Sequence, residues 1–307
     1  MYSIKKIAPV FLISFITVLQ SCSSSKSIEL SFNPQAGSTY KYVTTTDQTT
    51  SQEAMGQKME SKNHMEMYAT YAVANNKDND RELNVTYDRI VMKQSAMGME
   101  VSVDTDVTDT TTTTGSMQTT KMFQNMKGQP FSIVLTKDGN IKEVKGFSSI
   151  MDKMMNATGN ESSQEVKQSM KALLGEDFIK SMFTQAFKIF PDKKVGVNDI
   201  WKTKMEIKSL LGLALENSYT LKSFDDKKAV LDVQSTITTN GDMDMMGMKI
   251  KGDLKGKSNG IIEVERNTGM VLNSNIKQTI AGEMEVMNMK VPISIDQTVK
   301  IEAKPLK

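Results

Sequence analysis

Strict alternation of side-chain type over long stretches is the feature that most constrains the fold of this chain. Between Ile250 and Val264 the even positions are apolar or small, while most odd positions are charged or polar. Successive side chains of a β-strand point to opposite faces, so this pattern predicts one strand with a small, apolar face and a charged face. Fifteen residues at about 3.3 Å each extend about 50 Å, a length typical of strongly coiled sheets.

The same period of two recurs along most of the chain, and turn-forming residues separate the segments. Strands with one apolar face are typical of antiparallel sheets whose other face contacts solvent. Gly37–Lys41 and Val197–Lys202 each open such a series. We therefore expect a mainly β (α+β) protein with long curved antiparallel sheets or a half-barrel, in two weakly similar halves. The alternating segments are Tyr40–Thr46, Met65–Val73, Leu83–Tyr87, Met99–Val107 and Leu231–Ile237.

Between the two halves the period changes to that of a helix. Ser162–Glu165 reads as a capping box before an apolar series that reaches Leu174. A second helix is expected over Glu176–Phe190, ending at Pro191, and a shorter one over Ser148–Met155. These form a central helical insertion at residues 147–190. The Thr-rich run Thr108–Thr120 reads instead as a polar strand or a mobile loop.

The N-terminus has the composition of a secretory signal. A short basic segment, Met1–Lys6, precedes an apolar run of thirteen residues, Ile7–Leu19, which is too short to span a bilayer. The following residues, Leu19-Gln20-Ser21-Cys22, resemble the bacterial lipobox. That resemblance implies cleavage before Cys22 and acylation of this residue, which becomes a lipid anchor. Two or three acyl chains make release from a membrane negligible without a carrier.

These features divide the chain into a signal peptide (1–21), a Ser-rich tether (22–27), an N-terminal β half (28–146), the helical insertion (147–190) and a C-terminal β half (191–307). By resemblance to other bacterial lipoproteins, sorting depends on the residues just after the Cys. Ser23–Ser27 contains no Asp and no acidic run. This predicts the periplasmic face of the outer membrane, with surface display as the alternative.

Two resemblances extend beyond the anchor. The arrangement of strands and helices, with the segments Phe131–Gly146 and Phe190–Trp201, resembles a family of uncharacterised bacterial outer-membrane lipoproteins over most of the mature chain. That family implies no activity. A curved sheet with helices on its concave side is similar in architecture to the carrier and receptor proteins that move lipoproteins across the periplasm. No local motif supports this second likeness, which is an analogy of fold.

Charge and composition exclude several classes of function. Of the 38 Lys and Arg residues only Lys5 and Lys6 precede Cys22, so the mature chain carries 36 basic and 36 acidic residues. Such a balance does not provide the basic surface that nucleic-acid binding needs. The chain has one Cys and one His, His64, which the alternation places on the outward face. We expect no enzymatic activity, no cofactor and no His- or Cys-based metal site.

Methionine is unusually frequent, with 25 residues in the chain. Three interpretations are open: Met as a strand filler in place of Leu and Ile, Met as an adaptable surface for an apolar ligand, and thioether binding of Cu(I). Several of these residues flank expected hairpin tips: Met55, Met59, Met97, Met99, Met243, Met245, Met246, Met248, Met284, Met287 and Met289.

The function that best fits these observations is non-catalytic binding of an apolar ligand or acyl chain in the cell envelope. The ligand would lie between the helices and the concave sheet, against Met182, Phe183, Phe187 and Leu254. An alternative is a structural or assembly partner of an envelope protein complex, in which case the helices would fill the concave side. Met-based copper handling is a third hypothesis, which requires Met clusters that are exposed and close together.

Overall fold

The structure is a computed structural model, which describes residues 26–54, 56–74, 80–107, 114–157, 175–207, 212–245, 248–286 and 288–306. Within these ranges a single twelve-stranded antiparallel sheet dominates, accompanied by a two-stranded pair and three helices. The expectation of a mainly β protein with a long curved antiparallel sheet is confirmed.

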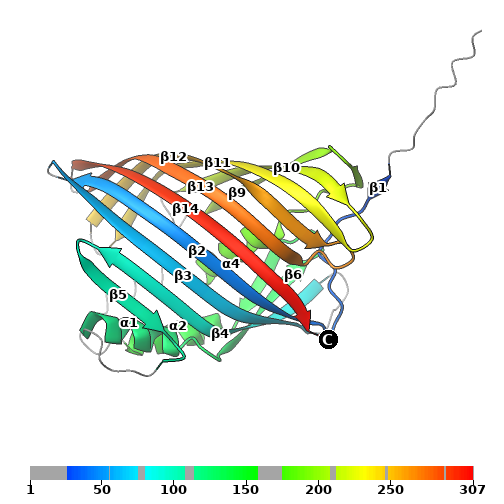
Figure 1. Cartoon of the computed structure of the whole chain (residues 1–307), viewed down its shortest axis with the longest axis horizontal. Coiled ribbons are helices and arrows are strands. Elements are labelled where there is room, and N and C mark those ends of the chain that lie inside the picture. The colour runs from blue at the N-terminus through cyan, green and yellow to red at the C-terminus, as the bar shows by residue number, and fades with distance from the viewer. Residues whose placement is uncertain are drawn as a thin grey trace, which may run out of the picture.

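The strands of the large sheet follow the alternating segments closely, and many are long. The stretch Ile250–Val264 lies within β12, as its alternation predicts (Figure 1). The strands are β2 (Thr39–Ala54), β3 (Gln57–Val73), β4 (Asp80–Ala96), β5 (Met99–Asp104), β6 (Pro130–Thr136), β7 (Ile141–Lys145), β9 (Ile200–Ile207), β10 (Leu213–Phe224), β11 (Lys228–Met245), β12 (Met248–Glu265), β13 (Val271–Val286) and β14 (Met289–Leu306).

The strand order joins the two ends of the chain. It runs β7-β6-β4-β3-β2-β14-β13-β12-β11-β10-β9, with β5 also paired to β4. Strand β2 pairs along its length with β14, so strands from both expected halves belong to one sheet (Figure 1). The edge strands of this path, β7 and β9, are not paired with one another in the described part of the chain, so the sheet is open.

Helices fill one end of the concave face. The helices are α1 (Thr114–Gln124), α2 (Phe147–Ala157) and α4 (Glu176–Phe187). Side chains of α2 and α4 share one hydrophobic core with inward residues of strands on both sides of the β2–β14 pair. The rings of Phe183 and Phe187 stack with centroids 6.3 Å apart, and Phe183 also meets Tyr71 and Phe131 at 6.4 and 6.0 Å. Aromatic side chains therefore fill the concave face at the end where the helices pack, which we call the filled end.

The N-terminal segment braces this filled end. β1 (Ser27–Ile28) pairs with β8 (Val195–Gly196), which follows the helices. The backbone N–H of Phe32 donates to the carbonyl of Lys137 in the β6–β7 turn, and that of Asn33 donates to Thr268 in the β12–β13 turn. Two turns from opposite parts of the sheet are thereby tied to one short segment.

The helical expectations are met in part. α2 and α4 occupy the expected positions, although α4 ends at Phe187 rather than Phe190. Ile189 and Phe190 are instead buried in the core beyond the last turn. The helix expected after Ser162 lies outside the described residues. The expectation of a strand or loop for the Thr-rich run is wrong from Thr114 onward, where α1 begins. Met122, Phe123 and Met126, just beyond the end of α1, have the i, i+3, i+4 spacing of a helix and pack against the core.

Where an inward residue is glycine, the neighbouring strand lies too close to leave room for a Cβ atom. A Cβ atom on Gly260 of β12 would lie 2.1 Å from the backbone oxygen of Asn275 and 2.8 Å from the Cα of Ile276, both in β13. Neither is the far end of a flexible side chain, so the two strands would have to separate.

We predict that Gly260→Ala lowers the free energy of unfolding by about 2–3 kcal/mol, because its Cβ would overpack against a neighbouring backbone. Lys255→Ala, at an exposed outward position of the same strand, is the matched control and should change stability by less than about 0.5 kcal/mol. Urea unfolding of the soluble chain measures both. Equal effects of the two substitutions would show that the sheet does not need glycine here.

Candidate ligand-binding site

A row of polar side chains crosses the concave face of the sheet along one line of strand register. Each member is the direct Cα partner of the next, so all of them point to the same side. We call this row the polar belt; it consists of Thr203 (β9), Asn217 (β10), Ser235 (β11), Ser258 (β12), Gln278 (β13), Gln297 (β14), Gln48 (β2), Asn63 (β3) and Gln94 (β4).

Burial shows that the belt lies on the inward face. On β13, Gln278 is half-buried with its neighbours Ile276 and Ile280, whereas Lys277 and Thr279 are exposed. On β10 and β11, the belt residues Asn217 and Ser235 are only 7% and 8% exposed. The alternation that defines the strands therefore also defines which face carries the belt.

The belt separates two apolar regions of the same face. On β9, β10, β11 and β13, the residue two positions to one side of the belt belongs to the main core and the residue two positions to the other side belongs to a smaller cluster. The core side contributes Trp201, Tyr219, Val233 and Ile276; the other side contributes Met205, Leu215, Ile237 and Ile280. The helices cover only the core side, so the belt marks the limit of the filled end.

A cavity of about 1110 Å³ lies over the belt. Its lining comes in groups of three consecutive residues per strand, and the middle residue of each group points inward. Six of these middle residues are belt members: Ser258, Gln278, Gln297, Gln48, Asn63 and Gln94. The seventh is Val101 of β5, the register partner of Gln94. A volume near 1000 Å³ is at the upper end of the range for small-molecule sites.

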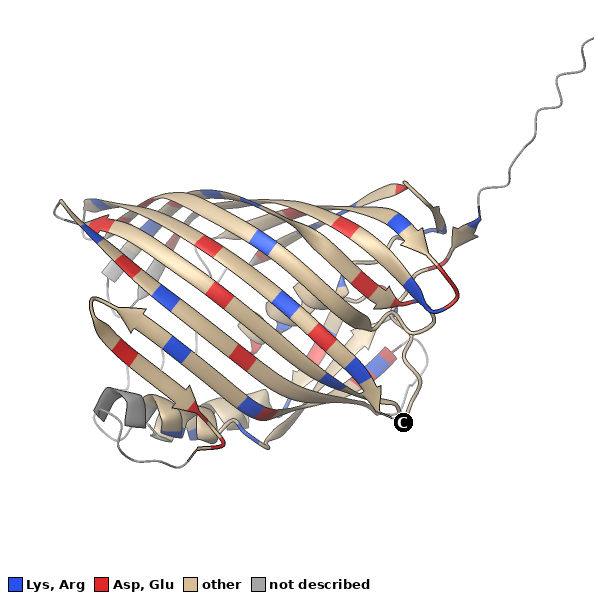
Figure 2. Ribbon diagram, viewed as in Figure 1, with Lys and Arg blue, Asp and Glu red and all other residues tan. Residues whose placement is uncertain are grey.

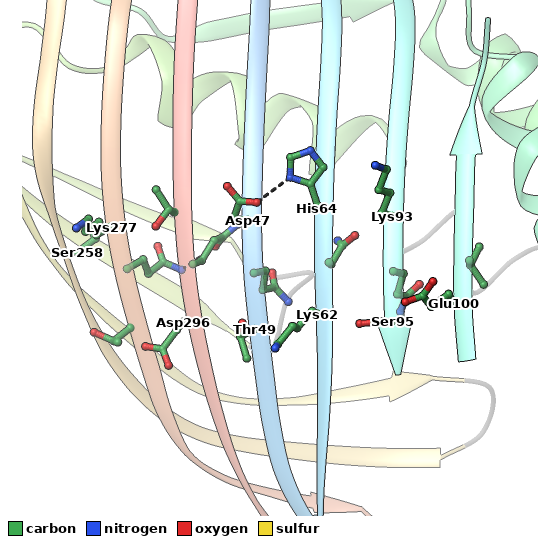
Figure 3. Close-up of a pocket in the computed structure, with 18 of the residues that line it drawn as sticks. Asp47, Thr49, Lys62, His64, Lys93, Ser95, Glu100, Ser258, Lys277 and Asp296 are labelled. Atoms are coloured by element: carbon green, nitrogen blue, oxygen red, sulfur yellow. Dashed lines mark hydrogen bonds and ion pairs between the residues drawn. The ribbon is translucent and has the colours of Figure 1, made fainter. Parts of the chain in front are cut away.

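Figure 3 shows the flanking members of these groups, with Asp47, Lys62, His64 and Lys93 on adjacent strands β2, β3 and β4. The alternation places them on the opposite face from the belt. Nδ1 of His64 lies 2.7 Å from Asp47, and Nε2 lies 3.4 Å from Glu66. The hydrogen bond to Asp47 raises the pKa of His64 above its ordinary value. This outward position of the single histidine is the one that the sequence predicts.

The polar groups of the belt are incompletely paired. Gln278 donates from Nε2 to Oε1 of Gln297 over 3.4 Å, and Gln48 donates to the hydroxyl of Thr50 over 3.1 Å. The Oδ1 atom of Asn63 is buried and accepts no hydrogen bond from the described residues. Each primary amide has two donor hydrogens and an acceptor oxygen, so the belt presents unused hydrogen-bonding capacity to the cavity.

The concave face around the belt is uncharged. On each belt strand, the residues two and four positions away on the same face carry no charge. The inward-facing Arg81 lies farther along β4, where Nε donates to Oδ1 of Asn33 over 3.1 Å. Figure 2 shows that Lys, Arg, Asp and Glu are spread over the long strands, with both signs mixed. Because outward positions take these charges, the inner surface around the belt has apolar and neutral polar groups only.

The structure distributes the predicted site residues over different places. Phe183 and Phe187 are core residues, 6% and 4% exposed, and pack against other rings. Met182 is 38% exposed on α4, and Leu254 of β12 is buried four residues beyond the belt, outside the cluster that holds the two Phe side chains. Cys22 lies outside the described residues. The four residues predicted to bind a ligand, Met182, Phe183, Phe187 and Leu254, do not surround one cavity, and their assignment stays a prediction.

No local motif marks the belt in the sequence. A glutamine or asparagine inside an apolar alternating strand is the available signal, as in Ile276-Lys277-Gln278-Thr279-Ile280. The partners of Gln278 become visible only when the register of β13 with β12 and β14 is known.

The described residues also bear on other kinds of site. They hold no group of three or more His, Cys, Asp and Glu side chains that could bind a metal ion. No helix among them is long and apolar enough to cross a membrane. Met97 and Met99 at the β4–β5 turn are 74% and 68% exposed, while Met55 and Met246 lie outside the described residues.

Residues 78–271, more than half of the chain, match the model of a protein family of unknown function, DUF6263. The protein belongs to the DUF6263 family. The match begins just before β4 and ends at the start of β13, so it includes the helices and the C-terminal strands as far as β12. No curated protein matches the chain.

Solved structures resemble this DUF6263 member only distantly. A structure described as lipid–protein interactions in lipovitellin matches with a TM-score of 0.49 and 10% identity, covering 88% of this chain and 25% of that chain. The chain thus spans a quarter of that relative's length. The translocator domain of the autotransporter NalP from Neisseria meningitidis gives a TM-score of 0.24 and 6% identity, covering 88% of this chain and 89% of that chain. An outer-membrane channel from Pseudomonas putida F1 gives 0.22 and 10%, covering 89% and 97%.

We predict that Asp47→Asn lowers the pKa of His64, because the carboxylate stabilises the protonated ring. The raised pKa means that charged His64 stabilises the fold at low pH and that this contribution is lost as pH rises through the folded pKa. One imidazole signal in an NMR titration reports the value, since the chain has a single histidine. Asp296→Asn, which removes an equal charge from β14, is the control; an equal shift in both variants would contradict the contact.

Proposed function

We propose that this DUF6263 protein is a membrane-anchored, non-catalytic binder of an apolar or amphipathic ligand, such as an acyl chain, on the concave face of its sheet. The observation that supports this most directly is the cavity of about 1110 Å³ on an uncharged inner surface. The cavity lies beyond the helices rather than between the helices and the sheet, because aromatic rings fill the latter space.

Apolar side chains beside the belt could supply the binding energy. Ile280 of β13 and Ile295 of β14 are half-buried register partners directly next to the belt, and Leu215 and Ile237 extend the same apolar region. Burial of a methylene contributes about 0.8 kcal/mol, so ten methylenes contribute about 8 kcal/mol before the entropic costs of binding. An acyl chain of ordinary length is therefore a sufficient ligand.

The chemistry of the inward side chains supports binding rather than catalysis. The belt members that line the cavity are amides and one serine, and their nearest neighbours on the same face are apolar or hydroxyl-bearing. General acid–base catalysis and nucleophile activation need a titratable group beside the reacting atoms. The inward cavity lining of the described residues offers no such group.

The anchor and location form part of the same proposal. Acylation of Cys22 would tether the domain to a membrane through the tether 22–27, and the absence of Asp in Ser23–Ser27 favours the outer membrane, periplasmic face. This placement rests on the sequence alone.

A second candidate is a structural or assembly role in an envelope protein complex. Strand β9 is an edge of the sheet, and Ile200 at its start is 63% exposed. Unpaired edges can accept a strand from another chain. Copper handling remains a third hypothesis, for which Met97 and Met99 supply exposed thioethers.

We predict that the soluble form beginning at Ser23, which lacks the signal and Cys22, retains an apolar adduct in native mass spectrometry after incubation with envelope lipids. Ile280→Glu should reduce the adduct at least tenfold, because it places a charge on the inner face beside the belt. Thr279→Glu is the matched control, since the same charge then lies on the exposed outward face. A clean apo mass for the unsubstituted protein would contradict ligand binding and direct attention to protein partners.

We further predict that Cys22→Ser abolishes membrane association, because no acyl chain can then be attached. Fractionation of a Gram-negative host measures it: the unsubstituted protein is expected with the outer membrane, and Cys22→Ser in the soluble periplasmic fraction. Ser21→Ala keeps the Cys and serves as the control. Equal membrane association of the two variants would rule out Cys22 as the anchor.

A further inference from the structure

We propose that the polar belt recognises uncharged hydrogen-bonding groups of the ligand, so that the ligand is a neutral acylated lipid with hydroxyl and ester groups, such as an acylglycerol. This inference rests on the proposed function and specifies its ligand class. It distinguishes such a lipid from a fatty-acid anion, a charged phospholipid and a plain hydrocarbon.

The spacing of the belt supports recognition by amide groups. Neighbouring strands lie about 4.8 Å apart, so the belt presents a polar side chain at about that interval across the inner face. The five neighbours Gln278, Gln297, Gln48, Asn63 and Gln94 are all amides. An amide NH₂ donates to an ester carbonyl, and an amide oxygen accepts from a hydroxyl. A polyol ester presents both kinds of group close together.

The unpaired acceptor in this row points to a ligand donor. Asn63 stands between Gln48 and Gln94, its Oδ1 is buried, and no described residue donates to it. A buried acceptor without a donor destabilises a protein, and Asn63 is one of the residues that line the cavity. A hydroxyl group of the ligand would satisfy this oxygen once the Asn63 side chain turns toward the cavity.

The surroundings of the belt set the shape of the ligand. Ile280 and Ile295 flank the belt on the side away from the helices, and Ile276 and Val299 flank it on the core side. A molecule that lies along the strands would cross the belt once, with its polar group at the amides and its chain over the apolar rows. The chain runs away from the helices, because the rings of Phe183 and Phe187 occupy the other direction.

The lack of inward cations beside the belt argues against an anionic head group. Lys62, Lys93 and Lys277 each stand next in sequence to a belt residue that lines the cavity. The alternation directs their side chains to the convex face. Arg81 is buried at the filled end of β4 and donates to Asn33 and to the backbone oxygen of Asp80. A carboxylate or phosphate on the concave face would be desolvated without an opposite charge.

The test is displacement of an uncharged fluorescent probe, N-phenyl-1-naphthylamine, from the soluble form beginning at Ser23 at pH 8. Monooleoylglycerol, oleate and 1-octadecene, each delivered from cyclodextrin, are the competitors. We expect monooleoylglycerol to bind at least tenfold more tightly than the other two. The double variant Gln278→Met and Gln297→Met should lose about tenfold in affinity for monooleoylglycerol and none for octadecene, because only hydrogen bonds are removed. Thr279→Val, on the outward face, is the control.

A second variant separates recognition from stability. Asn63→Leu removes the unpaired acceptor, so it should raise the melting temperature of the ligand-free protein while lowering its affinity for monooleoylglycerol about threefold to tenfold. A purely structural role would not couple these two changes in opposite directions. Lys62→Leu, the outward neighbour, is the matched substitution and should leave the affinity unchanged.

The outcomes distinguish the two proposals. Equal affinities for monooleoylglycerol and octadecene, tighter binding of oleate, or unchanged binding by the double variant would overturn recognition by the belt and leave apolar ligand binding standing. Absence of displacement by all three competitors, with the probe itself unbound, would overturn both.

Discussion

The pairing of β2 with β14 is the contact on which the rest of the architecture depends. It joins strands from opposite ends of the chain, from Thr39↔Leu306 to Gln52↔Ile293, and so makes one sheet from two series of hairpins. The loop it closes is nearly the length of the chain, but the entropic cost of closure grows only slowly with loop length. Without this pair, Gln48 and Gln297 would not be neighbours and the polar belt would be cut in two.

Local patterns were sufficient to predict many of the strands and their faces, and insufficient to predict how distant strands meet. The alternation in Ile250–Val264 gives β12 and its inward side directly, because a strand has a fixed side-chain period. The turns between consecutive strands then give their order. The partnership of Gln48 with Gln297 depends on a contact between residues far apart in the sequence, which no local pattern carries. The belt was therefore invisible even though the alternating segments predicted five of its strands, β2, β3, β4, β11 and β12.

The predicted site residues show the same limit of local sequence patterns. Large apolar residues at helical spacing, such as Phe183 and Phe187, are equally consistent with a ligand pocket and with a packed core. In the structure their rings meet other rings. The space between α4 and the sheet decides between a pocket and a packed core. That space depends on the positions of the N-terminal segment and of the two turns to which it is hydrogen-bonded. The Thr-rich run shows a related effect, because α1 begins within it at Thr114 and continues to Met122 and Phe123, which pack partly against the core.

With Cys22 as the anchor, the short N-terminal segment would also limit how the molecule is oriented. Only four residues, Ser23–Lys26, lie between Cys22 and Ser27 in β1, which makes five Cα-to-Cα steps of at most about 3.5 Å each. With Cys22 as the anchor, β1 therefore stands within about 18 Å of the bilayer surface, together with the filled end that it braces. The filled end of the sheet would then face the membrane, and the cavity would lie farther from the lipid. Cargo would then have to travel around the protein or arrive from the aqueous side, so delivery by a second carrier would suit this geometry better than direct extraction from the anchoring leaflet.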